Sequence, residues 1–196
     1  MIAVCGGSFN PPTKAHIEMI KKVGNLNYIE KTIILPVGDF YNKEELVSSE
    51  HRINMLNLIF DGMDKFIVSD LEAKSDKQLK TLESLRLIKE CYPDKDIAFV
   101  MGADNLKDIK NWYKYEKILS GFNFIVFDRD NLSALDLIKN GVVLKDYRHK
   151  FFIERLNVEN GISSTKVRKL IKENKRYSEY MQYDVYEYIK KNKLYK

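Results

Sequence analysis

The sequence has few of the residues that build disulfide frameworks or metal clusters. Its two cysteines, Cys5 and Cys91, lie in or beside apolar segments, and we expect both to be small buried residues. The three histidines are scattered at positions 16, 51 and 149, so their spacing indicates no metal site. No hydrophobic run is as long as a membrane span, and no signal-peptide pattern is visible. These absences favour a soluble, cytoplasmic protein.

Signals of nucleic-acid binding are also scarce. The formal net charge is +5, and residues 166–196 supply it, with ten lysines and arginines against four aspartates and glutamates. A basic end of this kind can contact nucleic acid or border a polyphosphate site, but most often it is a solvated helix face. The chain has no aromatic RNA-binding signature and no zinc pattern. We therefore expect neither a nucleic-acid nor a membrane partner.

Short apolar runs alternate with segments of helical apolar spacing along the whole chain. Strands are predicted from Ile2 and at Lys31–Val37, Phe66–Val68, Asp96–Met101, Phe122–Phe127 and Phe151–Ile153. Two helices are predicted to begin at Thr13 and Ser49, and two others to end at Leu119 and Lys172. Three more are predicted at Thr81–Cys91, Leu132–Lys139 and Met181–Lys191. This alternation predicts an α/β fold, a Rossmann-like doubly wound parallel sheet. Residues 1–196 are expected to form one domain, with a C-terminal helical part at about 162–196.

The predicted topology also locates a site. Right-handed crossovers place the carboxyl ends of parallel strands along one edge of the sheet. That edge collects residues 6–16, 38–43, 102–104 and 128–129, together with the turn at Ser163. Ligands of open α/β sheets bind in the crevice at such an edge, so we expect the functional residues there.

The segment from Gly6 to His16 is the first candidate motif. Two glycines follow the first strand, Pro11 and Pro12 delay regular helix, and a helix then begins. This order directs helix N-terminal amides at the end of the strand, where phosphates bind, and it puts His16 in the first turns of the helix. The motif is neither a Walker A loop nor a G-x-G-x-x-G fingerprint. Taken alone, it is also compatible with a tight turn and a surface histidine.

A second candidate motif lies near the other end of the chain. Ser163, Ser164 and Thr165 begin a helix whose hydroxyls and free amides suit an anion. Lys166 and Arg168 add positive charge on the same turns. The alternative is a plain serine cap on a basic surface helix.

Together the two motifs resemble those of the nucleotidyltransferases that transfer a nucleoside monophosphate. Residues 6–16 resemble the signature G-x-F-x-P followed by His/Thr-x-Gly-His, with Thr13 at its first position and Ala15 in place of glycine. Residues 162–168 match the Ile-Ser-Ser-Thr-x-x-Arg motif of the same family. Further segments are similar to the nicotinate and nicotinamide mononucleotide adenylyltransferases, and the resemblance covers nearly the whole chain. They are residues 36–55, 101–104, 111–113 and 192–195.

The resemblance implies an enzyme of NAD biosynthesis that moves AMP from ATP to nicotinate or nicotinamide mononucleotide and releases pyrophosphate. It implies catalytic roles for His16, Thr13 and Arg168. ATP contacts are implied for Gly7, Ser8, Phe9, His16, Gly102, Asp104, Arg129, Ser163, Ser164, Thr165 and Arg168. Mononucleotide contacts are implied for Ser8, Lys43, Trp112 and Tyr113. Mg²⁺ is expected to arrive with the co-substrate ATP, and no residue is implied as a metal ligand.

Some alternatives stay open at this point. Where bacterial members often carry Ser-Tyr-Thr, this chain has Asp76, Lys77 and Gln78, which leaves the choice between acid and amide substrates open. A pantetheine-phosphate or alcohol-phosphate transferase is the nearest alternative, and a non-catalytic nucleotide-binding module or an RNA-binding protein is a more distant one. His51 and Arg52 are compatible with a solvated helix face, and His149 with an ordinary surface position. A homo-oligomer is compatible with the sequence.

Overall fold

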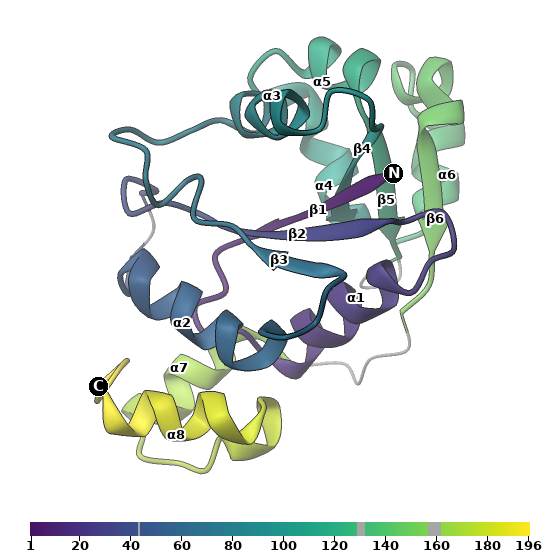
Figure 1. Ribbon diagram of the computed structural model, residues 1–196. Coiled ribbons are helices and arrows are strands. Elements are labelled where there is room, and N and C mark those ends of the chain that lie inside the picture. Colours follow the sequence, from purple (N-terminus) through teal and green to yellow (C-terminus); the bar gives the residue numbers. More distant parts are fainter. Residues whose placement is uncertain (43, 129–131, 157–161) are drawn as a thin grey trace.

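A six-stranded sheet lies at the centre of the computed structural model, which describes residues 1–42, 44–128, 132–156 and 162–196 (Figure 1). The strands are β1 (Ile2–Gly7), β2 (Lys31–Pro36), β3 (Phe66–Val68), β4 (Ile97–Gly102), β5 (Asn123–Phe127) and β6 (Phe151–Glu154). Their order is β3-β2-β1-β4-β5-β6, and all neighbours pair in parallel. The order reverses between β1 and β4, which creates the crevice where such sheets bind ligands. The predicted doubly wound α/β fold is confirmed.

Helices cover both faces of the sheet. On one face lie α1 (Lys14–Gly24) and α2 (Ser49–Phe60); on the other lie α3 (Thr81–Cys91), α4 (Ala103–Asp108), α5 (Tyr115–Gly121) and α6 (Ala134–Asn140) (Figure 1). Alternate residues of β1 supply the two cores: Ile2 and Val4 face the α3 side, whereas Ala3 and Cys5 face the α1 side. This burial on both faces explains why β1 is apolar throughout rather than alternating.

The C-terminal segment adds a third packed group. It contains α7 (Ser164–Lys172), a short 3₁₀ turn η3 (Ser178–Tyr180) and α8 (Tyr183–Lys191). Val167, Ile171, Val185 and Ile189 pack with Met55 of α2, so these helices lie against α2 rather than against the sheet (Figure 1). This packing carries the second motif to the vicinity of the first.

Three details differ from the sequence-based expectations. The helix predicted up to Leu119 is α5, which begins after Lys114 with its left-handed φ of 52°, whereas α4 and the 3₁₀ turn η1 (Ile109–Asn111) before it were not expected. A further 3₁₀ segment, η2 (Leu144–Lys150), precedes β6 and was not expected. Cys5 is buried, which raises the pKa of its thiol, but Cys91 is exposed and the expectation of burial was wrong there. In the described part of the chain, every helix is too short or too polar to cross a bilayer.

Candidate active site

The turn after β1 holds the first motif in an unusual conformation. Phe9 is buried and has a φ of 45°, in the left-handed region that non-glycine residues rarely adopt. Its ring packs on Gly7, where an added Cβ would lie 3.1 Å from the ring, so a side chain at position 7 would crowd the turn. Strained conformations of this kind cluster at ligand-binding turns.

His16, the N3 residue of α1, is oriented by Thr13. Its Nδ1 accepts a hydrogen bond from the backbone N–H of Thr13 at 3.1 Å and lies 2.8 Å from the Thr13 hydroxyl oxygen. Because a backbone N–H can only donate, Nδ1 must be an acceptor, and the neutral ring carries its proton on Nε2. Thr13 is fully buried in this contact. The backbone N–H and the hydroxyl of Thr13 both lie against Nδ1 and orient the histidine.

Arg52 is a site residue that sequence reasoning missed. It is fully buried, which rules out the solvated helix face that the sequence left open for it. Its guanidinium donates to the carbonyl of Val47 at 2.9 Å, to that of Ser8 at 3.3 Å and to Asp39 Oδ1 at 3.3 Å. Arg52 thereby ties α2 to the loop after β2 and to the turn of the first motif. A signal was present, because residues three and four positions later, Met55 and Leu56, belong to the buried stripe of α2.

The other two histidines have ordinary roles, as expected. His51 Nδ1 lies 2.9 Å from the hydroxyl of Tyr188, which also accepts a hydrogen bond from Asn54 at 3.2 Å. These bonds join α2 to α8. His149 is exposed in η2.

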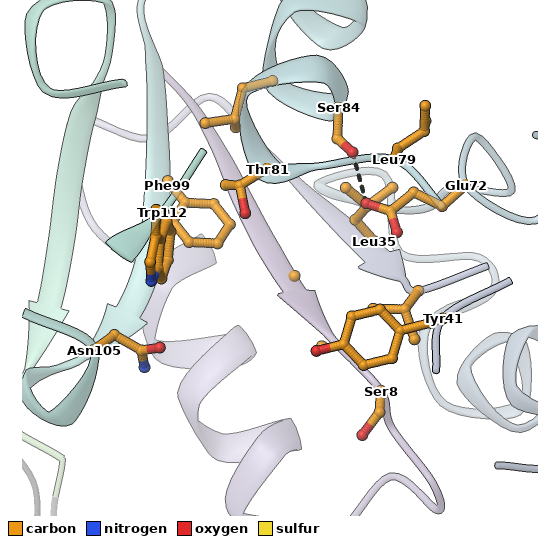
Figure 2. A pocket seen from close by; sticks show the side chains of 14 residues that line it. Ser8, Leu35, Tyr41, Glu72, Leu79, Thr81, Ser84, Phe99, Asn105 and Trp112 are labelled. Atoms are coloured by element: carbon orange, nitrogen blue, oxygen red, sulfur yellow. Dashed lines mark hydrogen bonds between the residues drawn. The ribbon is translucent and has the colours of Figure 1, made fainter. Parts of the chain in front are cut away.

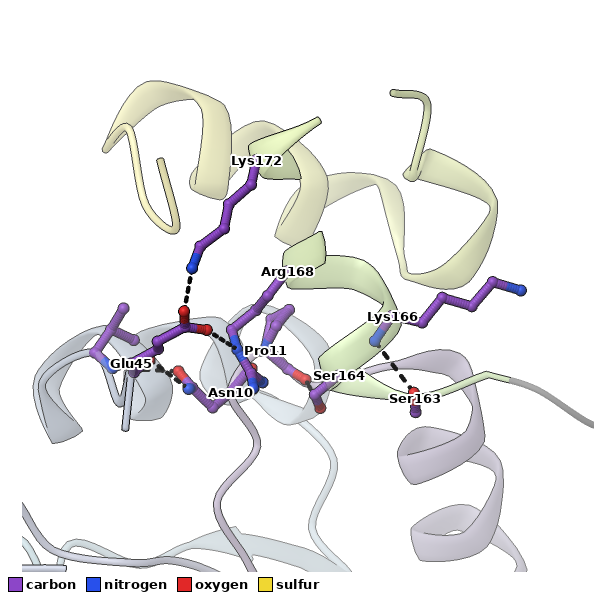
Figure 3. A network of polar contacts seen from close by, with 9 residues as sticks. Asn10, Pro11, Glu45, Ser163, Ser164, Lys166, Arg168 and Lys172 are labelled. Atoms are coloured by element: carbon purple, nitrogen blue, oxygen red, sulfur yellow. Dashed lines mark hydrogen bonds and ion pairs between the residues drawn. The ribbon is translucent and has the colours of Figure 1, made fainter. Parts of the chain in front are cut away.

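The second motif contacts the first directly (Figure 3). The hydroxyl of Ser164 donates to the carbonyl of Pro11 at 2.8 Å, and Arg168 donates to the carbonyl of Asn10 at 2.9 Å. Ser163 caps α7 by accepting from the backbone N–H of Lys166 at 3.2 Å, which is the plain cap considered from the sequence. Thr165 is exposed on the first turn. Two segments near opposite ends of the chain thus form one surface.

A carboxylate already occupies the cationic part of this surface. Glu45 Oε2 accepts from Arg168 Nε at 3.2 Å, while Oε1 pairs with Lys172 (Figure 3). Two hydrogen bonds lower the pKa of Glu45. The bond from Lys172 has the larger effect and the bond from Arg168 the smaller one. The backbone carbonyl of Glu45 also accepts from the side chain of Asn10 at 2.8 Å. Arg168 is 8% exposed, so its charge is held at a fixed place where it can bind an anion.

A cavity of about 240 Å³ opens beside the first motif at the carboxyl edge of the sheet (Figure 2). Its lining residues are Gly6, Gly7, Ser8, Leu35, Val37, Tyr41, Glu72, Leu79, Thr81, Ser84, Leu85, Phe99, Asn105 and Trp112. Ser8 and Trp112 were predicted to contact a mononucleotide, and both line it. Glu72, Thr81, Ser84 and Asn105 were missed, although each follows a strand on this edge or begins the helix after it.

The remaining predicted residues are placed as follows. Gly102 ends β4 and Asp104 lies in the first turn of α4, next to Asn105 of the cavity wall. Tyr113 is 48% exposed and is not among the lining residues, although its neighbour Trp112 is. Lys77, considered as a charge for the pyridine substituent, lies on the surface 3.5 Å from Glu83 and does not line the cavity either. Lys43 and Arg129 lie outside the described residues.

The described residues of the site supply hydrogen-bond donors and cations. Within residues 1–42, 44–128, 132–156 and 162–196, no group of three His, Cys, Asp or Glu side chains is placed to hold a metal ion. The cations, hydroxyls and helix N-termini near the first motif are suited to a phosphate chain, and the cavity beside it is suited to a flat ring.

Comparisons with known proteins agree with this geometry. Residues 4–170 match the model of the family described as cytidylyltransferase-like. The chain is 32% identical over 197 residues to the "Probable nicotinate-nucleotide adenylyltransferase" of Carboxydothermus hydrogenoformans, covering 100% of this chain and 98% of the relative. It is 32% identical over 196 residues to the protein of the same name from Acholeplasma laidlawii, covering 100% and 97%.

A solved structure shows the same arrangement. The nicotinic acid mononucleotide adenylyltransferase of Plasmodium falciparum, in complex with NaAD, superposes with a TM-score of 0.83 at 26% identity, over 99% of this chain and 96% of that chain. The same enzyme in complex with APC gives a TM-score of 0.81. The family match, the full-length identity and the superposition are consistent with one another, and the chain belongs to the cytidylyltransferase-like family, among the nicotinate-nucleotide adenylyltransferases.

Proposed function

We propose that this protein transfers the adenylyl group of ATP to nicotinate or nicotinamide mononucleotide, forming the dinucleotide and releasing pyrophosphate. The observation that carries the proposal is the contact of Ser164 and Arg168 with the backbone of the first motif, beside the cavity that Trp112 lines. This contact puts a set of anion-binding groups next to a pocket for a flat ring. The relatives named above are adenylyltransferases of this kind.

The proposed reaction is an in-line displacement at the α-phosphorus of ATP. A 5′-phosphate oxygen of the mononucleotide forms the new P–O bond, while the bond from the α-phosphorus to the leaving pyrophosphate oxygen breaks. Such a step needs alignment and charge stabilisation rather than a protein nucleophile. His16 donates its Nε2 proton in a hydrogen bond to a non-bridging α-phosphate oxygen as charge accumulates there. Thr13 keeps the ring in the tautomer that can do so.

The other residues take positioning roles in this proposal. The backbone amides of Gly7, Ser8 and Phe9 face the phosphates. The N-terminus of α7, from Ser163 to Thr165, together with Arg168 holds the β- and γ-phosphates. The adenosine ribose lies by Gly102 and Asp104. The pyridine ring stacks on Trp112, with Tyr113 beside it, and Lys43 and Arg129 remain proposed phosphate contacts.

Mg²⁺ is expected to bind with ATP. Mg²⁺ sites are usually built from substrate phosphates with one or two carboxylates, so the nucleotide brings most of the oxygen ligands. Asp104, in the first turn of α4, is a carboxylate on the proposed ATP side. When bound, the ion neutralises charge on the triphosphate.

Pyrophosphate release tests the function directly. We expect release with ATP and either mononucleotide, and none with pantetheine phosphate. The acid should be preferred in kcat/KM by less than about 100-fold, which corresponds to roughly 2.7 kcal/mol of differential binding. Turnover of pantetheine phosphate in place of the mononucleotides would assign the protein to another branch of the family. No release with any acceptor would identify a binding module.

Arg168→Ala should weaken the use of ATP. The variant loses a cation that we propose donates to the leaving phosphates, and such charged hydrogen bonds contribute about 1.5–3 kcal/mol. We expect kcat/KM for ATP to fall by roughly 10–100-fold at saturating mononucleotide. Lys166→Ala is the matched control on the same helix, because Lys166 packs its ammonium on the ring of Tyr180. If both variants retain the wild-type KM and kcat, α7 is an ordinary capped surface helix.

A further inference from the structure

The cavity beside the first motif is lined by one ionisable carboxyl group and by no described cation. Glu72 is the single Asp, Glu, Lys, Arg or His among the described lining residues (Figure 2). The remaining lining groups are apolar or neutral and include the rings of Tyr41, Phe99 and Trp112. Apart from that carboxyl group, the described lining of the pocket is therefore uncharged. A charged group in such surroundings is costly unless a ligand or a protein partner compensates it.

Glu72 is held in place from three sides. The hydroxyl of Ser84 in α3 donates to Oε1 at 2.7 Å. The backbone N–H of Gly38, after β2, also donates to the carboxylate, and Arg52 of α2 adds a favourable charge. Gly38 fits only as glycine, because an added Cβ would lie 2.2 Å from the backbone carbonyl oxygen of Glu72. Burial raises the pKa of Glu72, and the hydrogen bonds from Ser84 and Gly38, together with the charge of Arg52, oppose this rise.

An aromatic wall stands opposite this carboxylate. The rings of Phe99 and Trp112 meet edge to face, with centroids 5.9 Å apart and planes at 77°. In Figure 2, these two rings lie on one side of the cavity and Glu72 on the other, with Thr81 between them. A negative charge facing an aromatic surface is the arrangement that binds flat organic cations, because the ring faces and the carboxylate both attract positive charge.

We infer that Glu72 is a specificity-determining residue that recognises the positive charge of the pyridinium ring. The inference rests on the proposed function, since it takes a mononucleotide as the occupant of the cavity. In both the nicotinate and the nicotinamide mononucleotides, the ring nitrogen bears the ribose and is therefore cationic. Trp112 and Phe99 contact the ring, and Glu72 supplies the compensating negative charge. Pantetheine phosphate, the acceptor of the nearest alternative function, carries no such cation.

The test compares two ligands that differ in ring charge. Nicotinamide mononucleotide has a cationic ring, whereas its reduced form has a neutral dihydropyridine ring, the same amide and the same phosphate. Trp112 is the single tryptophan of the chain and lines the cavity, so its fluorescence reports binding of either ligand without turnover. We expect the wild type to bind the cationic form at least about 10-fold more tightly, and Glu72→Gln to lose that preference. A tenfold loss corresponds to about 1.4 kcal/mol.

Two further variants make the result specific. Asp76→Asn removes the same charge from an exposed position of the same segment and should retain the preference. Glu72→Asp keeps the charge and should retain most of the preference for the cationic ligand. A partly unfolded variant changes the fluorescence amplitude but not the ratio of the two dissociation constants. If Glu72→Gln weakens the binding of both ligands equally, or of neither, Glu72 is merely structural and the inference is wrong. Failure of the proposed function shows itself separately, as the absence of pyrophosphate release.

Discussion

His16→Ala is expected to lower kcat by about 10²–10³-fold, the usual effect of losing one donor to a developing oxyanion. The structure gives this expectation a specific form. Nδ1 accepts from Thr13, so Nε2 carries the proton and is the atom that we propose interacts with the α-phosphate. Because this interaction is strongest in the transition state, the KM for ATP should change little. Steady-state pyrophosphate release at varied ATP measures both parameters.

His149→Ala is the matched control, because His149 is an exposed histidine on η2. It should retain wild-type kinetics, and His16→Ala should still unfold cooperatively in urea, with a midpoint lowered only by the lost hydrogen bond from Thr13. The orientation of His16 is also relevant to the alternative that the protein is a non-catalytic nucleotide-binding module. Thr13 departs from the histidine of many relatives, yet its backbone N–H alone fixes the tautomer. An alanine variant at position 16 with near wild-type kcat would remove His16 from the mechanism.

Arg52→Met is expected to lower the free energy of unfolding by about 3 kcal/mol, the low end of the range for breaking a buried ion pair. The low end applies because the partner, Asp39, is 52% exposed and can be partly solvated when Arg52 is lost. The carbonyls of Ser8 and Val47 also lose their donor, and unsatisfied buried acceptors are costly. Urea unfolding followed by circular dichroism measures the change.

Arg86→Met provides the comparison for Arg52. Arg86 is exposed on α3, and exposed substitutions of this kind usually change stability by less than about 0.5 kcal/mol. If Arg52→Met changes stability as little as Arg86→Met, then the buried guanidinium does not tie α2 to the turn of the first motif. Methionine is chosen because it keeps the apolar stem volume and removes only the charged head.

Two features of the site explain how the first motif is held for chemistry. Arg52 contacts the carbonyl of Ser8 from α2, and Arg168 contacts that of Asn10 from α7. Both therefore fix the backbone whose amides we propose face the phosphates. Glu45 pairs with Arg168 and Lys172, so a triphosphate that reaches these cations must compete with a carboxylate. The cations that we propose bind the triphosphate are thus held in place by contacts within the protein.

The sequence alone determined the elements and the edge of the sheet where they meet. The strand Phe66–Val68 and the helix Thr81–Cys91 have the predicted bounds, and the two motifs lie at the carboxyl edge. These predictions succeeded because hydrophobic periodicity, glycine turns and serine caps act over a few residues and can be read locally. The anion-binding role of the second motif was predicted on the same basis and stays a prediction.

Only the tertiary structure decided which polar groups face each other. The sequence around Arg52 was compatible with a solvated position, but Arg52 donates to Val47, Asp39 and Ser8, the last of which lies 44 positions away in the chain. Glu45 pairs with Arg168, which is 123 positions away in the chain. Glu72 is held in the cavity wall by hydrogen bonds from Ser84 and Gly38. The local sequence around a charged residue is the same whether its side chain contacts water or another segment of the chain. What distinguishes the two cases is whether distant backbone brings a counter-charge or a donor within about 3 Å, and chain packing, not local sequence, sets that distance.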